Sequence, residues 1–480
     1  MRIITATFFN TVLRAFSTYF LFLLVASALF SACRKEDDFT TDAAARLSFS
    51  MDTVMFDTVF SQSGSVKPMS ITKQLWVINN NEKGVKVNIR IAGNLYGIYK
   101  INIDGQPTNA ISGKEIRGKD SIVIFVQVYL NQVNQNTPFI VTDQLLFETN
   151  GNQQDVDLVA FAQDAHYFRG QVLRGENGNL HWTADKPYVI YDSILVPKGY
   201  TLTIDAGTKV FSHIKSAILI GGTMVVNGTQ SNTVVFEGDR LDPDYRDRAG
   251  QWGSIHLLSS SMDNVITHAE IRNGLIGIRV DSLSNNQNPK LLLRNSIIKN
   301  MSSVGLLGFT ATITAINNAI VNCGQFTFYA RFGGNYNLYH NTFAAYPFRF
   351  NRQNQQFLLD NSPLTNAEGT QIIATFPLNV VMVNTIVYGT QEEELLINND
   401  PKGGTSNLLI QQCLLKTKLT AVNANGNIIN KDPLFVDASN NDFQLKDNSP
   451  AKGKGVFVNV TNDLLDKSRS ILAPTIGAYE

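Results

Sequence analysis

The stretch RNSIIKN at residues 294–300 decides the fold, because its pattern returns further along the chain. INNAIVN (316–322) and YHNTFAA (339–345) repeat it, each with an asparagine two positions before a large apolar residue. These asparagines follow one another at steps of 23 residues, 318 − 295 and 341 − 318. A period in the low twenties is typical of solenoids, in which each repeat buries its apolar face only against its neighbours.

The repeat extends in both directions from this stretch. Ile271 lies 26 residues before Ile297, and the spacings after Phe343 are 43 and then 28 residues. A second short strand, such as IGIRV (276–280), follows seven to nine residues after the apolar position in several repeats. A sandwich built from hairpins would not be expected to repeat both the period and the spacing to the second strand. We therefore predict a right-handed parallel β-helix of roughly ten rungs at residues 169–440, with one strand per rung in each of three sheets.

The recurring amides are expected to be structural rather than catalytic. Side chains stacked about 4.8 Å apart at a bend can donate to one another, as in asparagine ladders. Such a ladder also satisfies backbone groups that a corner leaves unpaired. The prediction is a single column of five side chains: Asn295, Asn318, Asn341, Asn384 and Gln412.

The first 33 residues have the layout of an export signal. Arg2 and Arg14 precede the apolar run FSTYFLFLLVASALF (16–30), and small residues then lead to Cys33. The run is shorter than the 18 or more apolar residues expected of a spanning helix, although an uncleaved membrane anchor is the alternative. Stable anchoring of a cleaved form would depend on lipid at Cys33, because several acyl chains hold a protein in a leaflet.

Two short motifs around Cys33 resemble those of bacterial lipoproteins. FSAC (30–33) is similar to a lipobox, which implies lipidation of Cys33, although Phe30 stands where leucine is usual. RKEDDF (34–39) resembles the acidic signal that sends some Gram-negative lipoproteins to the cell surface, and a solvated linker is the alternative. The expected location is thus the outer membrane, exposed at the cell surface, with the membrane as a partner through the lipid.

Residues 34–168 divide into a tether (34–45) and an all-β domain (46–168). VKVNIRI (85–91) alternates apolar and polar residues as a half-buried strand does. About eight such strands separated by turn clusters predict an antiparallel sandwich of immunoglobulin type. No catalytic residues gather there, so we expect a spacer or interaction domain.

Several phrases resemble the right-handed parallel β-helix repeat proteins, the superfamily that includes pectate-lyase-like folds. They are YTLTIDAGTKVF (200–211), GQWGSIHLL (250–258) and the closing DPLFVDASNNDFQLKDNSPAKGKG (432–455). The resemblance implies a surface protein, often a lipoprotein without an established reaction. Residues 441–480 are expected to fold back as a cap, since open strand edges recruit other chains.

The composition excludes several classes of function. Lys plus Arg and Asp plus Glu total 40 each, so no net charge draws the protein to nucleic acid. The six histidines are scattered and form no zinc-ligand spacing, although a Ser-His-Asp triad stays open because its members can be distant in sequence. Cys323 and Cys413 are expected to be free, buried thiols. We expect a monomer without a cofactor.

One loop, EGDRLDPDYRDRAGQW (237–252), is the most highly charged part of the chain. Its carboxylates could hold calcium, but three arginines oppose a cation, so a loop held by Asp–Arg pairs is favoured. This loop is expected to protrude from the surface, and it is therefore the first candidate for a polysaccharide-binding site. Its candidate residues are Asp242, Asp244, Tyr245, Arg246 and Trp252.

A basic stripe is the second candidate site. Arg279, Arg331 and Arg349 are expected to point outward beside Tyr329, Tyr336 and Tyr346, where they could pair with acidic sugars and stack on them. We predict non-catalytic binding of glycan or another extracellular partner, such as a surface protein. The alternative is a polysaccharide lyase or glycoside hydrolase acting on acidic polysaccharide, although no acidic pair recurs on this face. A purely structural spacer is the third possibility.

Overall fold

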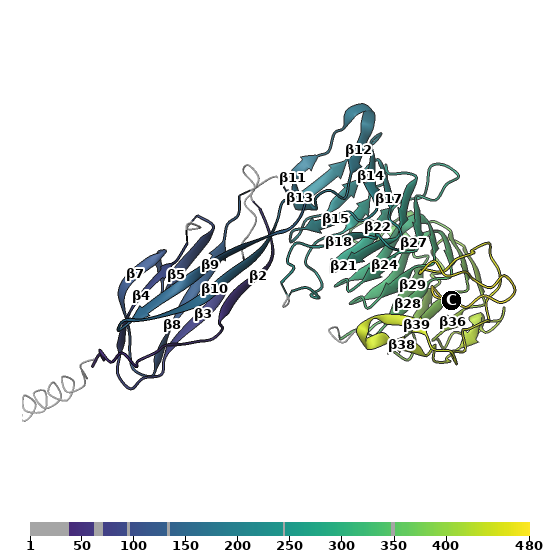
Figure 1. Cartoon of the computed structure of the whole chain (residues 1–480). Coiled ribbons are helices and arrows are strands. Elements are labelled where there is room, and N and C mark those ends of the chain that lie inside the picture. Colours follow the sequence, from purple (N-terminus) through teal and green to yellow (C-terminus); the bar gives the residue numbers. More distant parts are fainter. Residues whose placement is uncertain (1–37, 62–70, 94–96, 132–134, 243–244, 347–350) are drawn as a thin grey trace, which may run out of the picture. The chain divides into compact units, whose positions relative to one another are not determined.

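A computed structural model describes residues 38–61, 71–93, 97–131, 135–242, 245–346 and 351–480 (Figure 1). The expected signal peptide and Cys33 lie outside these residues. The chain divides into two compact units, one built chiefly from residues before Ala160 and the other chiefly from Ala160–Glu480. Within the described residues, no helix has the length and apolar character needed to cross a membrane.

The first unit is a β-sandwich of two five-stranded sheets. One sheet has the order β1 (Ser48–Phe49), β3 (Lys73–Asn79), β8 (Asp120–Val128), β5 (Tyr99–Ile103), β6 (Gln106–Pro107). The other has the order β2 (Thr53–Phe60), β10 (Asn152–Gln163), β9 (Phe139–Thr149), β4 (Val85–Ile91), β7 (Ala110–Ile116). Residues of β4 alternate strictly between buried and exposed, as the sequence predicts. The predicted sandwich is confirmed.

The second unit is a right-handed parallel β-helix whose 25 strands form three sheets along its length. Strands β11 (His166–Val172) and β13 (Tyr188–Val196) bend from sheet A into sheet B. Sheet A continues with β15 (Lys209–Ser212), β18 (Val234–Gly238), β21 (Ala269–Arg272), β24 (Ile297–Lys299), β26 (Ala319–Val321), β28 (Thr342–Ala345), β33 (Ile386–Gly389), β36 (Leu414–Leu415) and β37 (Ile428–Ile429).

Sheets B and C complete each rung. Sheet B contains β16 (Ile218–Ile220), β19 (Ile255–Leu257), β22 (Ile276–Asp281), the first parts of β25 (Val304–Ile316) and β27 (Phe326–Tyr339), β29 (Phe357–Asp360) and β34 (Leu395–Asn398). Sheet C contains β12 (Asn179–Trp182), β14 (Thr201–Asp205), β17 (Thr223–Asn227), β20 (Asn264–Thr267), β23 (Leu291–Arg294), the second parts of β25 and β27, β32 (Leu378–Val383) and β35 (Ser406–Gln411).

Inward side chains from the three sheets stack into a continuous core. Ile278, Leu306, Phe328 and Phe357 follow one another on sheet B, and all four are fully buried. The rings of Phe328 and Phe357 stack with centroids 4.7 Å apart. Each rung therefore buries its apolar side only against the next rung, which explains why the period is visible in the sequence.

The predicted single column of amides is wrong, because the five residues occupy two adjacent positions of the corner between sheets C and A. Ile297 pairs with Ala319, and Ala319 pairs with Thr342. Asn318 and Asn341 therefore follow one another in an inward column, preceded by Ser296 of RNSIIKN. Asn318 Nδ2 donates to Asn341 Oδ1 at 2.9 Å. This pair is a genuine ladder.

The remaining three amides lie one position earlier, where the chain takes a left-handed conformation. Asn295, Asn384 and Gln412 have φ of 45°, 52° and 47°. Their column also contains His268, Asn317 and His340, each with positive φ. Asparagine tolerates this left-handed conformation better than most residues. Its side-chain amide also forms hydrogen bonds at the inward corner position, as Asn318 and Asn341 do. Both corner positions therefore favour asparagine, so the sequence alone does not show which of the two positions a given asparagine occupies.

The C-terminal segment folds back onto sheet A. After the hairpin of β38 (Phe435–Asp437) and β39 (Asp442–Leu445), the chain to Glu480 covers the outer side of β26, β28, β33 and β36. Ile476 and Ala478 pack there with Ala344 and Ile386 in one buried apolar cluster. The outer face of this part of sheet A is consequently part of the core.

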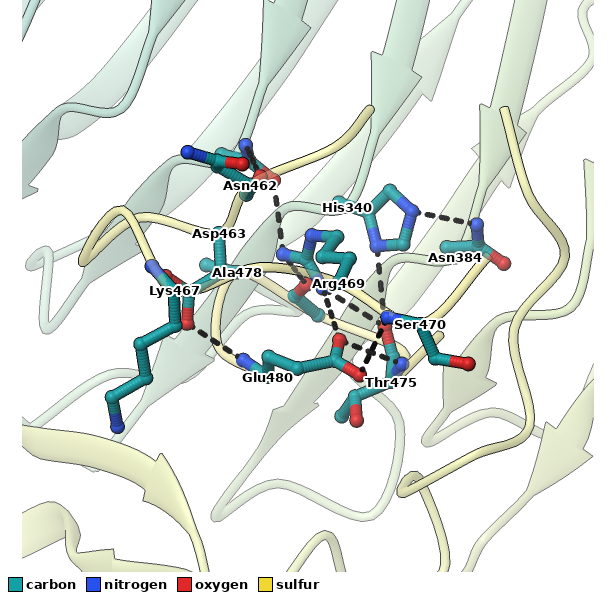
Figure 2. Close-up of polar contacts among 12 residues, drawn as sticks. His340, Asn384, Asn462, Asp463, Lys467, Arg469, Ser470, Thr475, Ala478 and Glu480 are labelled. Carbon is teal, nitrogen blue, oxygen red and sulfur yellow. Dashed lines mark hydrogen bonds and ion pairs between the residues drawn. The ribbon is translucent and has the colours of Figure 1, made fainter. Parts of the chain in front are cut away.

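A buried polar cluster holds the same segment to the left-handed corner (Figure 2). Arg469 donates to Asn317 Oδ1 at 2.9 Å and to the Gly477 carbonyl at 2.9 Å. Asn384 Nδ2 lies 2.9 Å from His340 Nε2, and His340 Nδ1 lies 3.2 Å from the Thr475 carbonyl (Figure 2). The corner column thus turns the chain and also binds the C-terminal segment. Short elements elsewhere are η1 (Glu176–Gly178), η2 (Thr420–Val422), η3 (Ala438–Asn440), β30 (Leu364–Thr365) and β31 (Ile372–Ala374).

Candidate ligand-binding face

The outer face of sheet B gathers charged and aromatic side chains from neighbouring rungs. His256 pairs in register with Arg279, which continues through Leu307 to Tyr329. Two positions further along the strands, Asp281 is followed by Phe309 and Arg331. Outward positions two residues apart share a sheet face, so these columns lie side by side. We call this set the arginine–aromatic face: His256, Arg279, Asp281, Phe309, Tyr329 and Arg331.

Asp281 is the fixed carboxylate of this face. His256 Nε2 lies 2.7 Å from its Oδ2, and Arg279 Nε donates to its Oδ1 at 2.8 Å. Partial burial alone would raise the pKa of Asp281, but the hydrogen bonds from His256 and Arg279 outweigh it and lower the pKa below its ordinary value. The carboxylate therefore stays ionised and orients both partners.

Arg331 is the exposed cation of this face. Its guanidinium carbon lies 5.8 Å from the centre of the Phe309 ring and 4.5 Å from that of Phe332. Arg279 approaches the same Phe309 ring, at 5.7 Å. Among the residues that the structure describes, no carboxylate forms an ion pair with Arg331. Ring contacts hold its planar group while leaving its N–H donors free for a ligand.

Tyr329 contributes an aromatic surface beside Arg331. It is half-buried, and its ring is tilted against Phe326 with centroids 5.0 Å apart. Burial raises the pKa of Tyr329 above its ordinary value, so its hydroxyl stays neutral. The structure thus brings together three residues of the predicted stripe, Arg279, Tyr329 and Arg331. Arg349 lies outside the described residues.

Two aromatic residues of the sequence-based candidates are not ligand platforms. Tyr336 was expected at the edge of the stripe, but it is buried in the core and donates to the Gly333 carbonyl at 3.0 Å. Trp252 is 1% exposed, and its Nε1 donates to the Arg272 carbonyl at 2.8 Å. Tyr336 lies in the inward phase of β27, and a one-residue shift exchanges the two faces of a strand. Trp252 precedes β19 and packs into the core. Tyr346 is half-buried and packs on Phe435 and Phe443.

The charged loop is closed on itself rather than open for a cation. The guanidinium of Arg240 lies 3.2 Å from the centre of the Tyr245 ring, and that of Arg248 lies at 4.6 Å. Asp242 is buried beside Arg240, at 3.4 Å. Arg246 is exposed, while its carbonyl accepts from Asn273 Nδ2. Asp244 lies outside the described residues, among which no three His, Cys, Asp or Glu side chains form a metal-binding group.

Three members of the arginine–aromatic face were missed in the sequence: His256, Asp281 and Phe309. His256 and Asp281 are 25 residues apart and meet only because their rungs are neighbours. The available signal was the pair Arg279 and Asp281, two positions apart on one outward-facing strand.

A second charged cluster lies on sheet A and is bridged by an arginine. Arg272 donates to Glu237 at 2.9 Å and to Glu270 at 3.1 Å, and Lys299 lies 2.9 Å from Glu270. Burial raises the pKa of Glu237, whereas the basic neighbours lower that of Glu270 despite its burial. Opposed pKa shifts are typical of acid–base pairs. Here Arg272 occupies the space between the carboxylates, so the cluster serves as a salt-bridge network.

Comparison with known proteins supports the fold. Residues 174–277 match the family model described as a pectate-lyase-like β-helix domain. The second unit is a parallel β-helix similar to that domain. No curated protein matches the chain significantly.

Solved structures show only distant likeness. A Porphyromonas gingivalis W83 protein of unknown function is 11% identical, with a TM-score of 0.18, and the match covers 27% of this chain and 60% of that one. The catalytic unit of a GH87 α-1,3-glucanase from Streptomyces thermodiastaticus is 10% identical, with a TM-score of 0.23, covering 72% and 64%. A family 123 glycoside hydrolase from Clostridium perfringens is 6% identical, with a TM-score of 0.17, covering 24% and 25%.

Proposed function

We propose that this protein binds an acidic glycan through the arginine–aromatic face, without cleaving it. The observation that carries the proposal is Arg331, an exposed guanidinium held over two aromatic rings and without an ion-pair partner among the described residues. The pectate-lyase-like family match of residues 174–277 supports a carbohydrate-related protein.

The chemistry of the face fits a sugar that carries carboxylate or sulfate groups. A guanidinium can bind such a group through two parallel hydrogen bonds. The half-buried rings of Phe309 and Tyr329 offer apolar surface to the C–H faces of sugar rings. Because Arg279 is already paired with Asp281, Arg331 supplies the cation that an acidic sugar would meet first.

The carboxylates of this face favour binding over hydrolysis. Hydrolysis of a glycosidic bond needs two carboxyl groups, one of them protonated as the acid. Asp281 is kept ionised by His256 and Arg279. Asp360 follows Leu359, the register partner of Ala330, and is 5% exposed. It accepts hydrogen bonds from Ser362 at 2.6 Å and from Asn398 at 2.9 Å. A lyase using an arginine as base is the alternative function.

Export and lipid anchoring are part of the proposal. A signal sequence ending at Cys33 would place the glycan-binding unit outside the cell, on the outer membrane. Replacing Cys33 with alanine should abolish metabolic labelling with a radioactive fatty acid and release the protein from membranes. Labelling that persists in Cys33→Ala would contradict the anchoring site.

The binding proposal is tested with the purified full-length protein. Isothermal titration with polygalacturonate should show binding, with a neutral glucan as the comparison. Arg331→Ala should weaken binding at least about tenfold, the effect of one charge-assisted hydrogen-bonding group. Arg294→Ala removes another exposed arginine, from sheet C, and should leave binding unchanged.

Three results would contradict this proposal. Wild-type affinity in Arg331→Ala would remove the proposed anchor. Equal losses in Arg331→Ala and Arg294→Ala would indicate a general charge effect. Growth of unsaturated-product absorbance during incubation, lost in Arg331→Ala, would identify a lyase instead.

A further inference from the structure

The first rung of the β-helix contains a cavity of about 480 Å³, separate from the arginine–aromatic face. Its walls come from β11, β12 and the start of β13. Phe168 and Val172 lie on β11, Leu180 and Trp182 on β12, and Tyr188 on β13. The arginine–aromatic face is built from β19, β22, β25 and β27, several rungs further along the sheets.

The floor of this cavity is a stack of aromatic rings. The rings of Trp182 and Tyr188 are 4.3 Å apart with 12° between their planes, and those of Phe168 and Trp182 are 5.4 Å apart with 20°. Trp182 and Tyr188 are almost fully buried, whereas Phe168 is half-buried and Val172 is 45% exposed. Phe168 and Val172 therefore present the accessible apolar surface of the cavity, and the buried rings of Trp182 and Tyr188 support it.

The rim of the cavity is polar and includes two imidazoles, His166 and His181, each paired with a carboxylate. His181 Nε2 lies 2.8 Å from Asp205 Oδ2, and His166 Nε2 lies 3.1 Å from Asp185 Oδ2. His181 is exposed, as are Gln171 and Arg174 beside the cavity. The rim thus presents polar side chains beside the aromatic rings, and the partner carboxylates orient its two imidazoles.

We propose that this cavity binds a neutral saccharide of one or two rings. A pyranose ring has an apolar C–H face and a polar edge, which match the apolar surface of Phe168 and Val172 and the two rim imidazoles respectively. A volume of about 480 Å³ lies within the usual range for small-molecule sites. A purely apolar ligand would leave the two pairs on the rim without new partners. The proposal does not depend on acidic-glycan binding at the arginine–aromatic face.

The test uses the full-length protein and three disaccharides: maltose, cellobiose and laminaribiose. Trp182 in the floor reports binding through tryptophan fluorescence, and saturation-transfer NMR on the ligand gives an independent measurement. At least one disaccharide should give a saturable response by both methods. His181→Ala and Phe168→Ala should each weaken it at least about fivefold, roughly 1 kcal/mol.

Two control variants distinguish binding in this cavity from binding at the arginine–aromatic face. Phe457→Ala removes an exposed aromatic ring from the C-terminal segment and should leave the disaccharide response unchanged. Arg331→Ala should also leave it unchanged while weakening polygalacturonate binding. Exposed His181 should be replaceable without unfolding, and circular dichroism checks this for every variant.

The proposal is overturned if none of the three disaccharides gives a saturable response. It is also overturned if the folded His181→Ala variant binds with wild-type affinity, or if Arg331→Ala abolishes the disaccharide response. Loss of polygalacturonate binding with intact disaccharide binding would affect only the acidic-glycan proposal.

Discussion

Asn318 and Asn341 are joined through their side-chain amides at 2.9 Å, and neither side chain is exposed to solvent. Asn318 also donates to the Leu293 carbonyl at 3.0 Å and accepts from the Ser296 backbone at 3.0 Å. One side chain thus bonds to groups on both neighbouring rungs, Leu293 and Ser296 on one side and Asn341 on the other. An amide in this position connects the rungs as well as turning the chain.

Replacing Asn318 with alanine should lower the free energy of unfolding by about 2–4 kcal/mol, because buried backbone groups lose their partners. Chemical denaturation of the purified protein measures the change. Asn407→Ala is the matched control, since Asn407 belongs to an outer ladder with Asn379 and is exposed. Its expected cost is below about 1 kcal/mol. Equal losses in the two variants would refute the role of burial.

His340 should make the protein less stable in acid. Burial, reinforced by the charge of Arg469, lowers the pKa of His340 to about 3. Its unfolded value is about 6.5. Between these values the unfolded chain takes up a proton that the folded protein refuses, so stability falls as the pH falls.

The His340 prediction is measured by thermal unfolding between about pH 7.5 and pH 5. His340→Gln should be less stable at neutral pH but lose less stability than the wild type on acidification. The same slope in both proteins would contradict this account.

Arg469 should hold the C-terminal segment in place. Besides Asn317 and Gly477, it contacts the Thr475 carbonyl and the Glu480 carboxylate, both at 3.2 Å. Arg469→Ala should therefore increase the rate at which a protease cleaves residues 446–480. Lys467→Ala is the control, because Lys467 is exposed in the same turn. Cleavage at the wild-type rate in both variants would show that apolar packing alone suffices.

The two cysteines of the β-helix should not react with iodoacetamide in the native state. Cys323 and Cys413 are free and fully buried, and burial raises the pKa of each thiol to about 12. The thiolate is the reactive form. Peptide mass spectrometry at about pH 8 should find both unmodified until denaturant is added. Rapid native labelling of either would show local opening of the core.

The period of the fold was predictable from the sequence, but the phase of its corners was not. Apolar residues mark each rung because the core needs them. The corner has two consecutive polar positions, as in Asn317–Asn318 and His340–Asn341, and a search for asparagine selects either one. The strand register distinguishes the two positions. The backbone conformation does so too, because only the first of the two has positive φ in each rung.

The candidate face was predictable only in part for a related reason. Arg279, Tyr329 and Arg331 were found because each lies on a recognisable strand. His256 was missed, because its partner Asp281 belongs to the next rung. Contacts between rungs depend on the number of residues in each turn, and loops change that number. Trp252 and Tyr336 were misjudged because aromatic residues suit both the core and the surface.

The left-handed corner keeps its alignment from rung to rung even where the chain between two corners differs in length. His340 and Asn384 occupy successive corners and bond to each other, although the chain between them includes the added hairpin of β30 and β31. Insertions of this size are accommodated without disturbing the stacking on either side. The corner therefore gives the protein evolutionary freedom: new surface can be added to a rung while its alignment with neighbouring rungs is preserved.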